Sequence, residues 1–225
     1  MGMFNAQSSV NAQVRTSATY LQAGIHNVKF MGVDKGDNAA YSTLDFAFED
    51  ENGAVHNERL FEPTSNERQQ NRFNNAIEDP SQAEQFMCKL MHIIAAINPE
   101  VHSKIQNGTL KFDPVNFDAL VVLVKKILDS KVGTEVQIKL VPNGRYVGFP
   151  GFPARISKNG DLYLSTAFIG QDLTLSAYEK AQIDKALQAK PTDMAKRDTS
   201  ELDDLESLVD DDESKTVDGD DDLPF

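Results

Sequence analysis

The chain has 225 residues, of which 35 are acidic and 22 basic, with one cysteine, no tryptophan and 40% hydrophobic residues. The single Cys88 excludes an internal disulfide framework and a thiolate metal cluster, so stability has to come from a packed core. No run approaches the about 20 apolar residues of a membrane span, and the N-terminal residues resemble neither a secretory signal nor a myristoylation motif. We therefore expect a soluble cytoplasmic protein with one domain and an appendage, with two small domains as the alternative.

The net charge of −13 is concentrated at one end of the sequence. Residues 198–225 hold 13 acidic side chains and one basic side chain, whereas the other 197 residues hold 22 acidic and 21 basic ones. A segment as acidic as 198–225 buries too little apolar surface to fold alone. We expect a flexible N-terminal arm or a poorly fixed first strand over 1–20, a domain over 21–197 and a disordered acidic tail over 198–225.

Hydrophobic alternation predicts strands early in the domain, over 25–33 and most clearly over 42–50. The dipeptide Asn52-Gly53 follows the second of these strands. Asn-Gly readily adopts the positive φ angles that a two-residue type I′ turn requires. We therefore expect a hairpin between 42–50 and about 54–61.

The middle of the domain, about 65–130, changes to a helical period. Ser81 and Glu84 form a capping box before an apolar stripe, and the stripe ends at Pro99, which predicts a helix over 82–97. This pattern indicates a helical insert between strands.

Further signals predict the remaining elements of the domain. Another helix should begin at Asp113-Pro114, an N-cap acceptor followed by a proline suited to the first helical position. The later predicted elements are a strand over 135–141, hairpin turns at Asn143-Gly144 and Asn159-Gly160, strands over 154–158 and 161–168, and a helix over 177–189 with a capping box of Ser176 and Glu179.

Strands, then helices, then further strands is the order of a Greek-key barrel of the oligonucleotide-binding (OB) type. We therefore expect a mainly β or α+β fold: an OB barrel with a helical insertion. An ordinary antiparallel α+β sandwich fits the same order, and the pattern alone does not separate the two.

No recognised catalytic motif is present in the sequence. The chain lacks a P-loop, a Gly-x-Ser-x-Gly elbow, a His-Glu-x-x-His pair and a Cys/His spacing for zinc. His92 and Cys88 share the predicted helix. A core or boundary position is a better interpretation of His92 than a metal ligand, and a small buried apolar residue is a better interpretation of Cys88 than a reactive thiol. We expect no catalytic residue, no metal and no cofactor.

A basic and aromatic segment, 131–160, is the first candidate for a binding site. It holds five cations and one acid, with aromatic residues between them. Single-stranded nucleic acid requires cations that follow phosphates and flat rings on which unpaired bases stack, at about 1–3 kcal/mol for each base. The candidates are Lys139, Arg145, Tyr146, Phe149, Phe152, Arg155 and Lys158. The alternative interpretation is that these aromatic residues plug the end of a barrel.

The first predicted sheet supplies secondary candidates, Lys29, Tyr41, Arg59 and Phe61. Adjacent side chains of a strand point to opposite faces, so Lys29 and Phe30 cannot share one face, and we expect Lys29 to point outward. For each of these residues, a scattered position on the surface is an equally good interpretation.

The C-terminal end carries the most specific signal in the sequence. After a run of aspartates the chain finishes with a hydrophobic tip, which an acidic tail that only solubilises would not need. Such a tip suits capture by a partner protein, with the final ring in an apolar pocket and the carboxylates on basic residues. The residues of this tip are Asp220, Asp221, Asp222, Leu223, Pro224 and Phe225.

The tip resembles that of bacterial and bacteriophage single-stranded DNA-binding proteins, which usually ends Asp-Asp-Ile-Pro-Phe. The resemblance implies an OB barrel that coats single-stranded DNA during replication, recombination and repair. It also implies a disordered tail that recruits partner enzymes such as a polymerase, a helicase or primase, or a nuclease. The greater length, the helical insert and the lack of tryptophan depart from the common bacterial form and point to a phage-type member, acting in the cytoplasm of a bacterium or an infected host.

Two other functions fit the same sequence. One is a strand-annealing recombination mediator. The other, of a different class, is an acidic protein-interaction adaptor or DNA mimic in which the tail does all the binding. The sequence also leaves homo-oligomerisation open.

Overall fold

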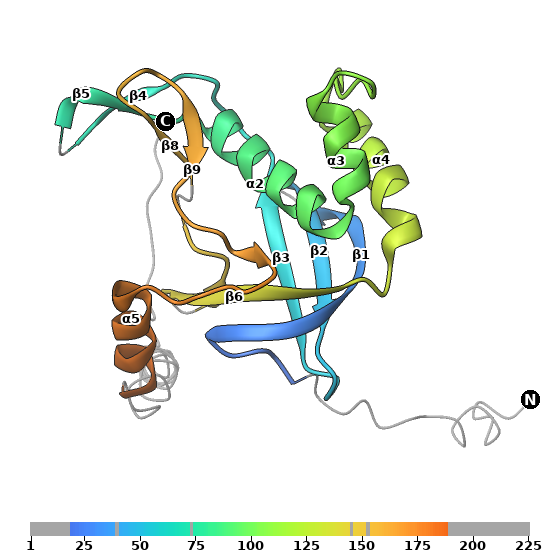
Figure 1. Cartoon of the computed structure of the whole chain (residues 1–225), viewed down its shortest axis with the longest axis vertical. Coiled ribbons are helices and arrows are strands. Elements are labelled where there is room, and N and C mark those ends of the chain that lie inside the picture. The colour runs from blue at the N-terminus through green and yellow to red at the C-terminus, as the bar shows by residue number, and fades with distance from the viewer. Residues whose placement is uncertain (1–18, 39–40, 73, 145, 152–153, 189–225) are drawn as a thin grey trace, which may run out of the picture. The chain divides into compact units, whose positions relative to one another are not determined.

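The computed structural model describes residues 19–188, apart from 39–40, 73, 145 and 152–153, and has a mixed α+β fold (Figure 1). The main antiparallel sheet has the strand order β10-β6-β1-β2-β3, and β7 adds to it by pairing with β6. Its strands are β1 (Gly24–Asn38), β2 (Tyr41–Glu49), β3 (Val55–Phe61), β6 (Glu135–Asn143), β7 (Tyr146–Gly148) and β10 (Ile169–Gly170). Two separate hairpins are β4 (Gln69–Asn71) with β5 (Asn74–Asp79), and β8 (Ala154–Ile156) with β9 (Leu162–Leu164).

The helices are α2 (Gln82–Ile97), α3 (Pro99–Gln106), α4 (Phe117–Leu128) and α5 (Ala177–Gln188), with a 3-10 turn η1 (Asp129–Lys131). Contacts within the chain divide it after Ile183. The first unit contains both hairpins, the main sheet and α2–α4, and of the second unit only the end of α5 is described. The expected α+β class is confirmed, with helices between β3 and β6.

β1 is long enough to pair with two strands, and it bends between them. Its first part, from Gly24 to Lys29, pairs with β6, and the part that continues to Asn38 pairs with β2. The register shifts between Phe30 and Gly32, and Gly32 has a φ of 140°, which residues with a side chain rarely adopt. The bulge therefore lets one strand turn from one part of the sheet into the other.

Backbone pairing within the described residues does not close the sheet into the expected barrel. Closure would require β7 to pair with β3, but a side chain connects these segments instead. The buried Glu58 of β3 accepts a hydrogen bond from the backbone amide of Phe149, one residue after β7, at 3.0 Å. The same carboxylate oxygen lies 3.1 Å from Nε2 of His56. A buried carboxylate thus bridges the two segments where a strand ladder is absent.

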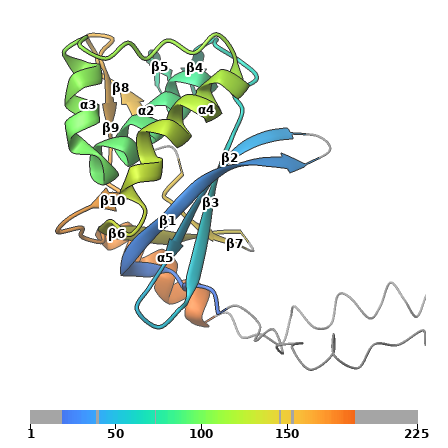
Figure 2. The ribbon, with the colours of Figure 1, turned by 90° about the vertical axis from the view of Figure 1, so that its right-hand side faces the viewer.

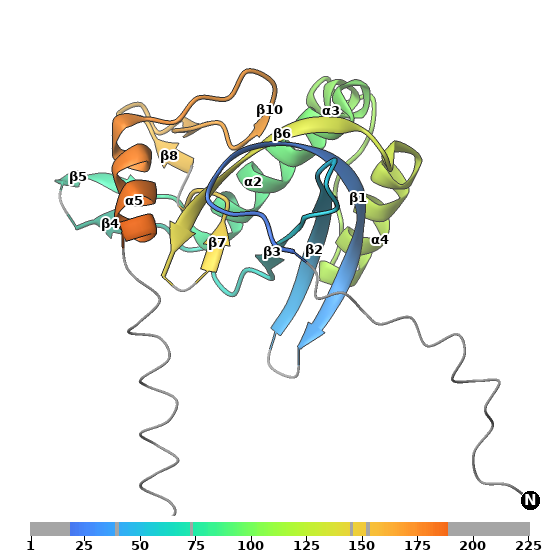
Figure 3. The same ribbon diagram turned by 90° about the horizontal axis from the view of Figure 1, so that it is seen from below.

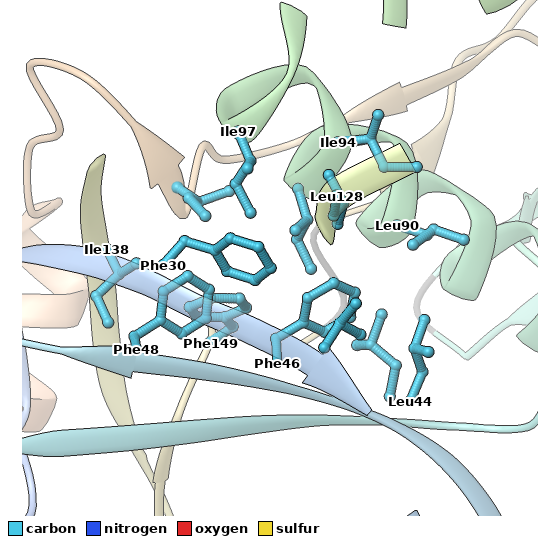
Figure 4. Packing of buried hydrophobic residues seen from close by; sticks show 14 of the residues in the cluster. Phe30, Leu44, Phe46, Phe48, Leu90, Ile94, Ile97, Leu128, Ile138 and Phe149 are labelled. Carbon is cyan, nitrogen blue, oxygen red and sulfur yellow. The ribbon is translucent and has the colours of Figure 1, made fainter. Parts of the chain in front are cut away.

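The hydrophobic core lies between the inner face of the sheet and the helices α2 and α4 (Figure 4). Strand alternation buries Leu44, Phe46 and Phe48 of β2, as the sequence pattern predicts. From the other side α2 contributes Leu90 and Ile94, both fully buried. Burial of a large apolar side chain contributes roughly 1.5–3 kcal/mol, so this layer is the main source of stability.

α2 has the bounds and the capping box that the sequence predicts. Oγ of Ser81 accepts a hydrogen bond from the amide of Glu84 at 3.2 Å, and Oε2 of Glu84 accepts one from the amide of Ser81 at 2.9 Å. Asn98 ends α2 and, by accepting a hydrogen bond from the amide of Val101, also caps α3, which begins with Pro99. The sequence prediction did not include α3.

The next helix begins later than predicted. Its cap is Asn116, whose Oδ1 accepts a hydrogen bond from the amide of Ala119 at 2.8 Å, so the start predicted at Asp113-Pro114 is wrong. The insert also does not begin with a helix, because β4 and β5 form a hairpin in its first part. Polar residues dominate that hairpin, so it lacks the hydrophobic alternation by which strands are recognised.

The hairpin between β2 and β3 is confirmed, but its turn is not of type I′. Gly53 has a φ of 78°, whereas Asn52 does not adopt the positive φ that a type I′ turn demands of it. Oδ1 of Asp50 accepts hydrogen bonds from the amides of Asn52 at 2.9 Å and Ala54 at 2.8 Å. The aspartate side chain therefore organises a longer loop than the Asn-Gly dipeptide predicts.

We expect the protein to lose stability as the pH falls, and the Glu84→Gln variant to lose less of it than the wild-type chain. The side-chain hydrogen bond from Arg68, aided by the amide of Ser81, lowers the pKa of Glu84 from 4.5 to about 2. Because this pKa is lower in the folded state, its stabilisation is full above pH 4.5 and is lost as the pH falls toward 2. Glutamine keeps the capping box, so the variant isolates the effect of the charge.

The measurement is the urea midpoint between pH 7 and pH 2. The Glu84→Gln variant should show a smaller decrease than the wild-type chain in the acid range. Glu67→Gln, an exposed carboxylate that pairs with no described cation, is the matched control. A decrease of equal size in the wild-type chain and the Glu84→Gln variant would contradict the prediction.

Candidate nucleic-acid interface

The outer face of β1, β2 and β3 carries four of the residues predicted to bind nucleic acid. Alternate positions of these strands enter the core, so the positions between them face outward. The outward positions include Lys29, Tyr41, Arg59 and Phe61, all of them exposed. The structure brings Tyr41, Arg59 and Phe61 together at one end of this face. Lys29 lies nearer the other end of β2, opposite Glu49.

Tyr41 and Phe61 form an exposed aromatic pair on neighbouring strands. Their ring centroids lie 6.2 Å apart at an interplanar angle of 86°, an edge-to-face contact. Tyr41 is 59% exposed and Phe61 is 55% exposed. Edge-to-face contact holds the two rings in a defined geometry while leaving ring surface in water. Such rings are suited to stacking with unpaired bases.

Gly36 of β1 keeps the face open beside this pair. A Cβ at Gly36 would lie 2.3 Å from Oγ1 of Thr43 and 2.7 Å from Oδ2 of Asp45. The Thr43 hydroxyl also donates a hydrogen bond to the carbonyl oxygen of Gly36 at 3.1 Å. Gly36 is paired with Thr43, and Thr43 with Phe61, across the three strands. Because Gly36 has no side chain, β1 contributes only backbone at this level of the sheet.

The cations of this face have acidic neighbours. Nε of Arg59 lies 3.1 Å from Oδ1 of Asp45, and its Nη2 lies 3.0 Å from Oδ2. The side-chain hydrogen bond to Asp45 raises the pKa of Arg59. Lys29 stands between Glu49 and Glu135 in the strand register. DNA phosphates would have to compete with these carboxylates for the cations. This face is therefore better suited to stacking bases on its aromatic rings than to binding phosphates.

Lys139 does not belong to a binding surface. It is 2% exposed, and its ammonium group lies 2.9 Å from Oε1 of Glu179 in α5. It also donates hydrogen bonds to Oγ1 of Thr166 at 2.8 Å and to the carbonyl oxygen of Thr174 at 3.2 Å. Burial alone raises the pKa of Glu179, but the Ser176 amide and Lys139 outweigh it, and the pKa is lowered. We therefore correct the prediction for Lys139, which is an internal ion-pair partner.

Phe149 is also removed from the candidate interface, because it is 2% exposed and forms part of the core. Its ring lies 4.7 Å from that of Phe168 and 6.0 Å from that of Phe48, centroid to centroid. The hydrogen bond that its backbone amide donates to the carboxylate of Glu58 holds its backbone in place. For Phe149 the alternative interpretation of the sequence, an internal aromatic plug, describes its position.

Tyr146 is the exposed aromatic of the β6–β7 hairpin. It is 79% exposed and pairs with Asn143 across the turn. Figures 2 and 3 show that the β6–β7 and β1–β2 hairpins project from the same side of the sheet. Tyr146 is the first residue of β7 and Tyr41 the first residue of β2, so both belong to hairpins on this side of the sheet.

The β8–β9 hairpin holds the remaining described candidates, Arg155 and Lys158. Both are exposed, Arg155 on β8 and Lys158 in the turn. The structure adds Tyr163, which stands opposite Arg155 in the strand register and is 50% exposed. The sequence prediction missed Tyr163. The turn signal at Asn159-Gly160 could have revealed it, because a hairpin with this turn places Tyr163 beside Arg155.

Several predicted residues lie outside the described part of the chain. They are Arg145, Phe152 and the tip residues Asp220, Asp221, Asp222, Leu223, Pro224 and Phe225. The arm and the tail lie outside it as well, except for Thr19 and Tyr20 at the end of the arm. Tyr20 forms a parallel bridge with Val55 of β3.

Within the described ranges, no group of three histidine, cysteine, aspartate or glutamate side chains could hold a metal ion. No helix in the same ranges is long and apolar enough to cross a membrane.

His92 packs against Phe168 with ring centroids 4.8 Å apart, and burial lowers its pKa. Burial also raises the pKa of the half-buried Cys88 thiol. His92 thus has the core or boundary position that the sequence predicts, whereas Cys88 is only half-buried and not a buried core residue as expected.

No protein-family model and no curated protein matches the sequence of this chain.

Proposed function

We propose that the protein is a non-enzymatic, sequence-independent single-stranded DNA-binding protein. The observation that carries the proposal is the exposed pair of Tyr41 and Phe61, with Arg59 beside it on β3. Stacking tolerates any base sequence because every base has a flat face. It also requires bases that are not covered by neighbours in a duplex, so binding would oppose hairpins in the DNA.

The order of the strands supports the same function. β1, β2 and β3 precede the helices, and the β6–β7 hairpin follows them, which is the chain order of an OB fold. OB folds bind oligonucleotides on the face of their second and third strands, where Tyr41 and Phe61 lie. We propose that the sheet is an open form of this barrel, in which the bridge from Glu58 to Phe149 replaces a closing ladder.

The acidic tail is proposed to have two roles. Its tip would recruit replication, recombination or repair enzymes, and its aspartates would compete with DNA for the cations of the body. A tethered segment is present at an effective concentration of about millimolar, so weak attraction is sufficient for competition. The net charge of −13 does not oppose DNA binding, because 13 of the 35 acidic side chains belong to 198–225.

Deleting residues 198–225 is expected to strengthen binding to single-stranded DNA at low salt, by up to about tenfold, because the deletion removes a tethered polyanion. The difference should shrink as salt rises, since screening weakens the attraction between tail and body. The core lies within residues 21–169, so the deletion leaves the domain intact. Titration of labelled oligo-dT at several salt concentrations measures the effect. Equal affinities at low salt would contradict competition by the tail.

The experiment that tests the function is salt-dependent binding of the full chain to labelled oligo-dT and to a duplex of equal length, read by fluorescence anisotropy. We expect the single strand to bind at least about tenfold more tightly, because only unpaired bases can stack. The slope of log affinity against log salt reports the phosphates engaged. No binding to oligo-dT at low salt, with or without the tail, would overturn the proposal.

A further inference from the structure

The β8–β9 hairpin presents a cation and an aromatic ring side by side, outside the main sheet. Arg155 of β8 and Tyr163 of β9 are directly opposite each other in the strand register, and both are exposed. The alternate residues Ala154 and Ile156 are buried, 0% and 7% exposed. Side chains of a cross-strand pair have Cβ atoms about 5 Å apart. One nucleotide could therefore contact both side chains, with its base stacked on Tyr163 and its phosphate bound by Arg155.

Hydrogen bonds within the turn and packing beneath it fix this hairpin. The amide of Ser157 donates to the carbonyl oxygen of Asp161 at 2.8 Å, and that of Gly160 donates to the carbonyl oxygen of Ser157 at 2.9 Å. Oγ of Ser157 accepts from the amides of Asn159 and Asp161 at 3.2 and 3.1 Å. β8 packs against α2 and β5. A ligand would meet a surface that is already ordered, which lowers the loss of entropy on binding.

The cations of this hairpin differ from those of the main sheet. Arg155 and Lys158 form no ion pair with any described residue, whereas Arg59 pairs with Asp45 and Lys139 with Glu179. Residues 154–164 contain these two cations and a single acid, Asp161. Uncompensated cations release counterions when they meet phosphates, and this is the main source of affinity for a polyanion. The hairpin therefore supplies the charge that the sheet face lacks.

We infer that the β8–β9 hairpin is a second contact for single-stranded DNA, in which Tyr163 stacks on a base and Arg155 and Lys158 contact phosphates. The inference rests on the proposed function and extends it. The hairpin forms its own two-stranded sheet, so it is a separate element from the face that carries Tyr41 and Phe61. A short oligonucleotide would occupy one contact, whereas a longer one would engage both and gain affinity through the linkage between them.

The chain contains no tryptophan, so a single substitution creates a specific reporter. In the full-length protein, Tyr163→Trp should lose fluorescence when oligo-dT binds, because a base stacked on the indole quenches its emission. Tyr41→Trp reports on the sheet face in the same way. Tyr178→Trp, an exposed tyrosine of α5, is the matched control and should change little. A duplex of equal length should quench the Tyr163→Trp reporter much less than the single strand does.

A charge reversal tests the contribution to affinity. Arg155→Glu combined with Tyr163→Ser should weaken binding of a long oligo-dT by at least roughly 5-fold, because it removes one stacked base and reverses a charge that contacts phosphate. The binding of an oligonucleotide short enough to occupy only the sheet face should change much less. Lys126→Glu combined with Tyr178→Ser is the control of equal charge change, because Lys126 is exposed on α4. Thermal unfolding of each variant establishes that it is folded.

The results separate this inference from the proposed function. If no variant and no wild-type chain binds oligo-dT, both are wrong. If wild type binds and the Tyr41→Trp reporter is quenched while the Tyr163→Trp reporter is not, only the second contact is wrong. Equal affinity of the Arg155→Glu/Tyr163→Ser variant for the long oligonucleotide would also overturn it.

Discussion

Replacing Tyr41 and Phe61 together by alanine is expected to weaken binding to single-stranded DNA by at least about 30-fold, since each ring stacks a base at about 1–3 kcal/mol. The fold should be preserved, because both side chains are more than half exposed and neither belongs to the core. Anisotropy titration with labelled oligo-dT at fixed salt measures the loss. Thermal unfolding, with an unchanged midpoint, shows that the variant remains folded.

The dependence on salt distinguishes stacking from charge at this face. The aromatic variant should keep the wild-type slope of log affinity against log salt, because neither ring contacts a phosphate. Arg59→Ala should instead reduce the slope by no more than about 1, since Arg59 is paired with Asp45 in the free protein. Tyr178→Ala is the matched control for loss of an exposed ring. Unchanged affinity of the Tyr41/Phe61 variant would move the site away from the sheet face.

Replacing Lys139 by methionine is expected to destabilise the protein by about 3–5 kcal/mol, because it leaves the buried carboxylate of Glu179 without its cation. The hydroxyl of Thr166 and the carbonyl oxygen of Thr174 lose their hydrogen bonds to the ammonium group as well. Urea unfolding followed by circular dichroism measures the change at pH 7. Lys104→Met, which breaks an exposed ion pair with Glu100, is the control and should cost about 0–1 kcal/mol.

The destabilisation by Lys139→Met should depend on pH in a defined direction. In the wild-type protein the pKa of Glu179 is lowered, so its contribution is present above its unfolded pKa and is lost as the pH falls through the folded value. Without Lys139 the buried carboxylate favours the protonated form. The difference between variant and wild type should therefore shrink at acid pH. A difference that is constant from pH 7 to pH 3 would mean that packing, not charge, accounts for it.

Much of the local structure could be predicted from the sequence, because the signals involved are local. The alternation of apolar residues predicts β2, and the capping box at Ser81 predicts the first turn of α2. The predicted elements are wrong or missing where two local signals for a helix start compete, or where a strand carries no hydrophobic pattern. Asn116 rather than Asp113 caps α4, and the polar hairpin of β4 and β5 carries no hydrophobic pattern.

The candidate interface could be predicted only in part, because exposure depends on contacts between distant segments. Phe149 and Tyr146 lie three residues apart, yet one is in the core and the other is 79% exposed. Glu58, 91 residues away, helps to fix the position of Phe149. A ring suited to stacking with a base and a ring that fills a core are the same chemical group, so composition cannot separate them.

By itself the sequence determined the positions of the main strands, the capping of α2 and α5, and the separation of a nearly neutral body from an acidic tail. These properties depend on the hydrophobic period, on side chains within one helical turn and on counts of charge. The tertiary structure decided which basic and aromatic residues are available to a ligand. Lys139 meets Glu179 from 40 residues away, Arg59 meets Asp45 across two strands, and Arg155 stands beside Tyr163 without an ion-pair partner in the described residues. Folding determines which carboxylates lie next to a cation, and therefore whether that cation is available to bind a ligand. For that reason the charged residues of one segment have different roles.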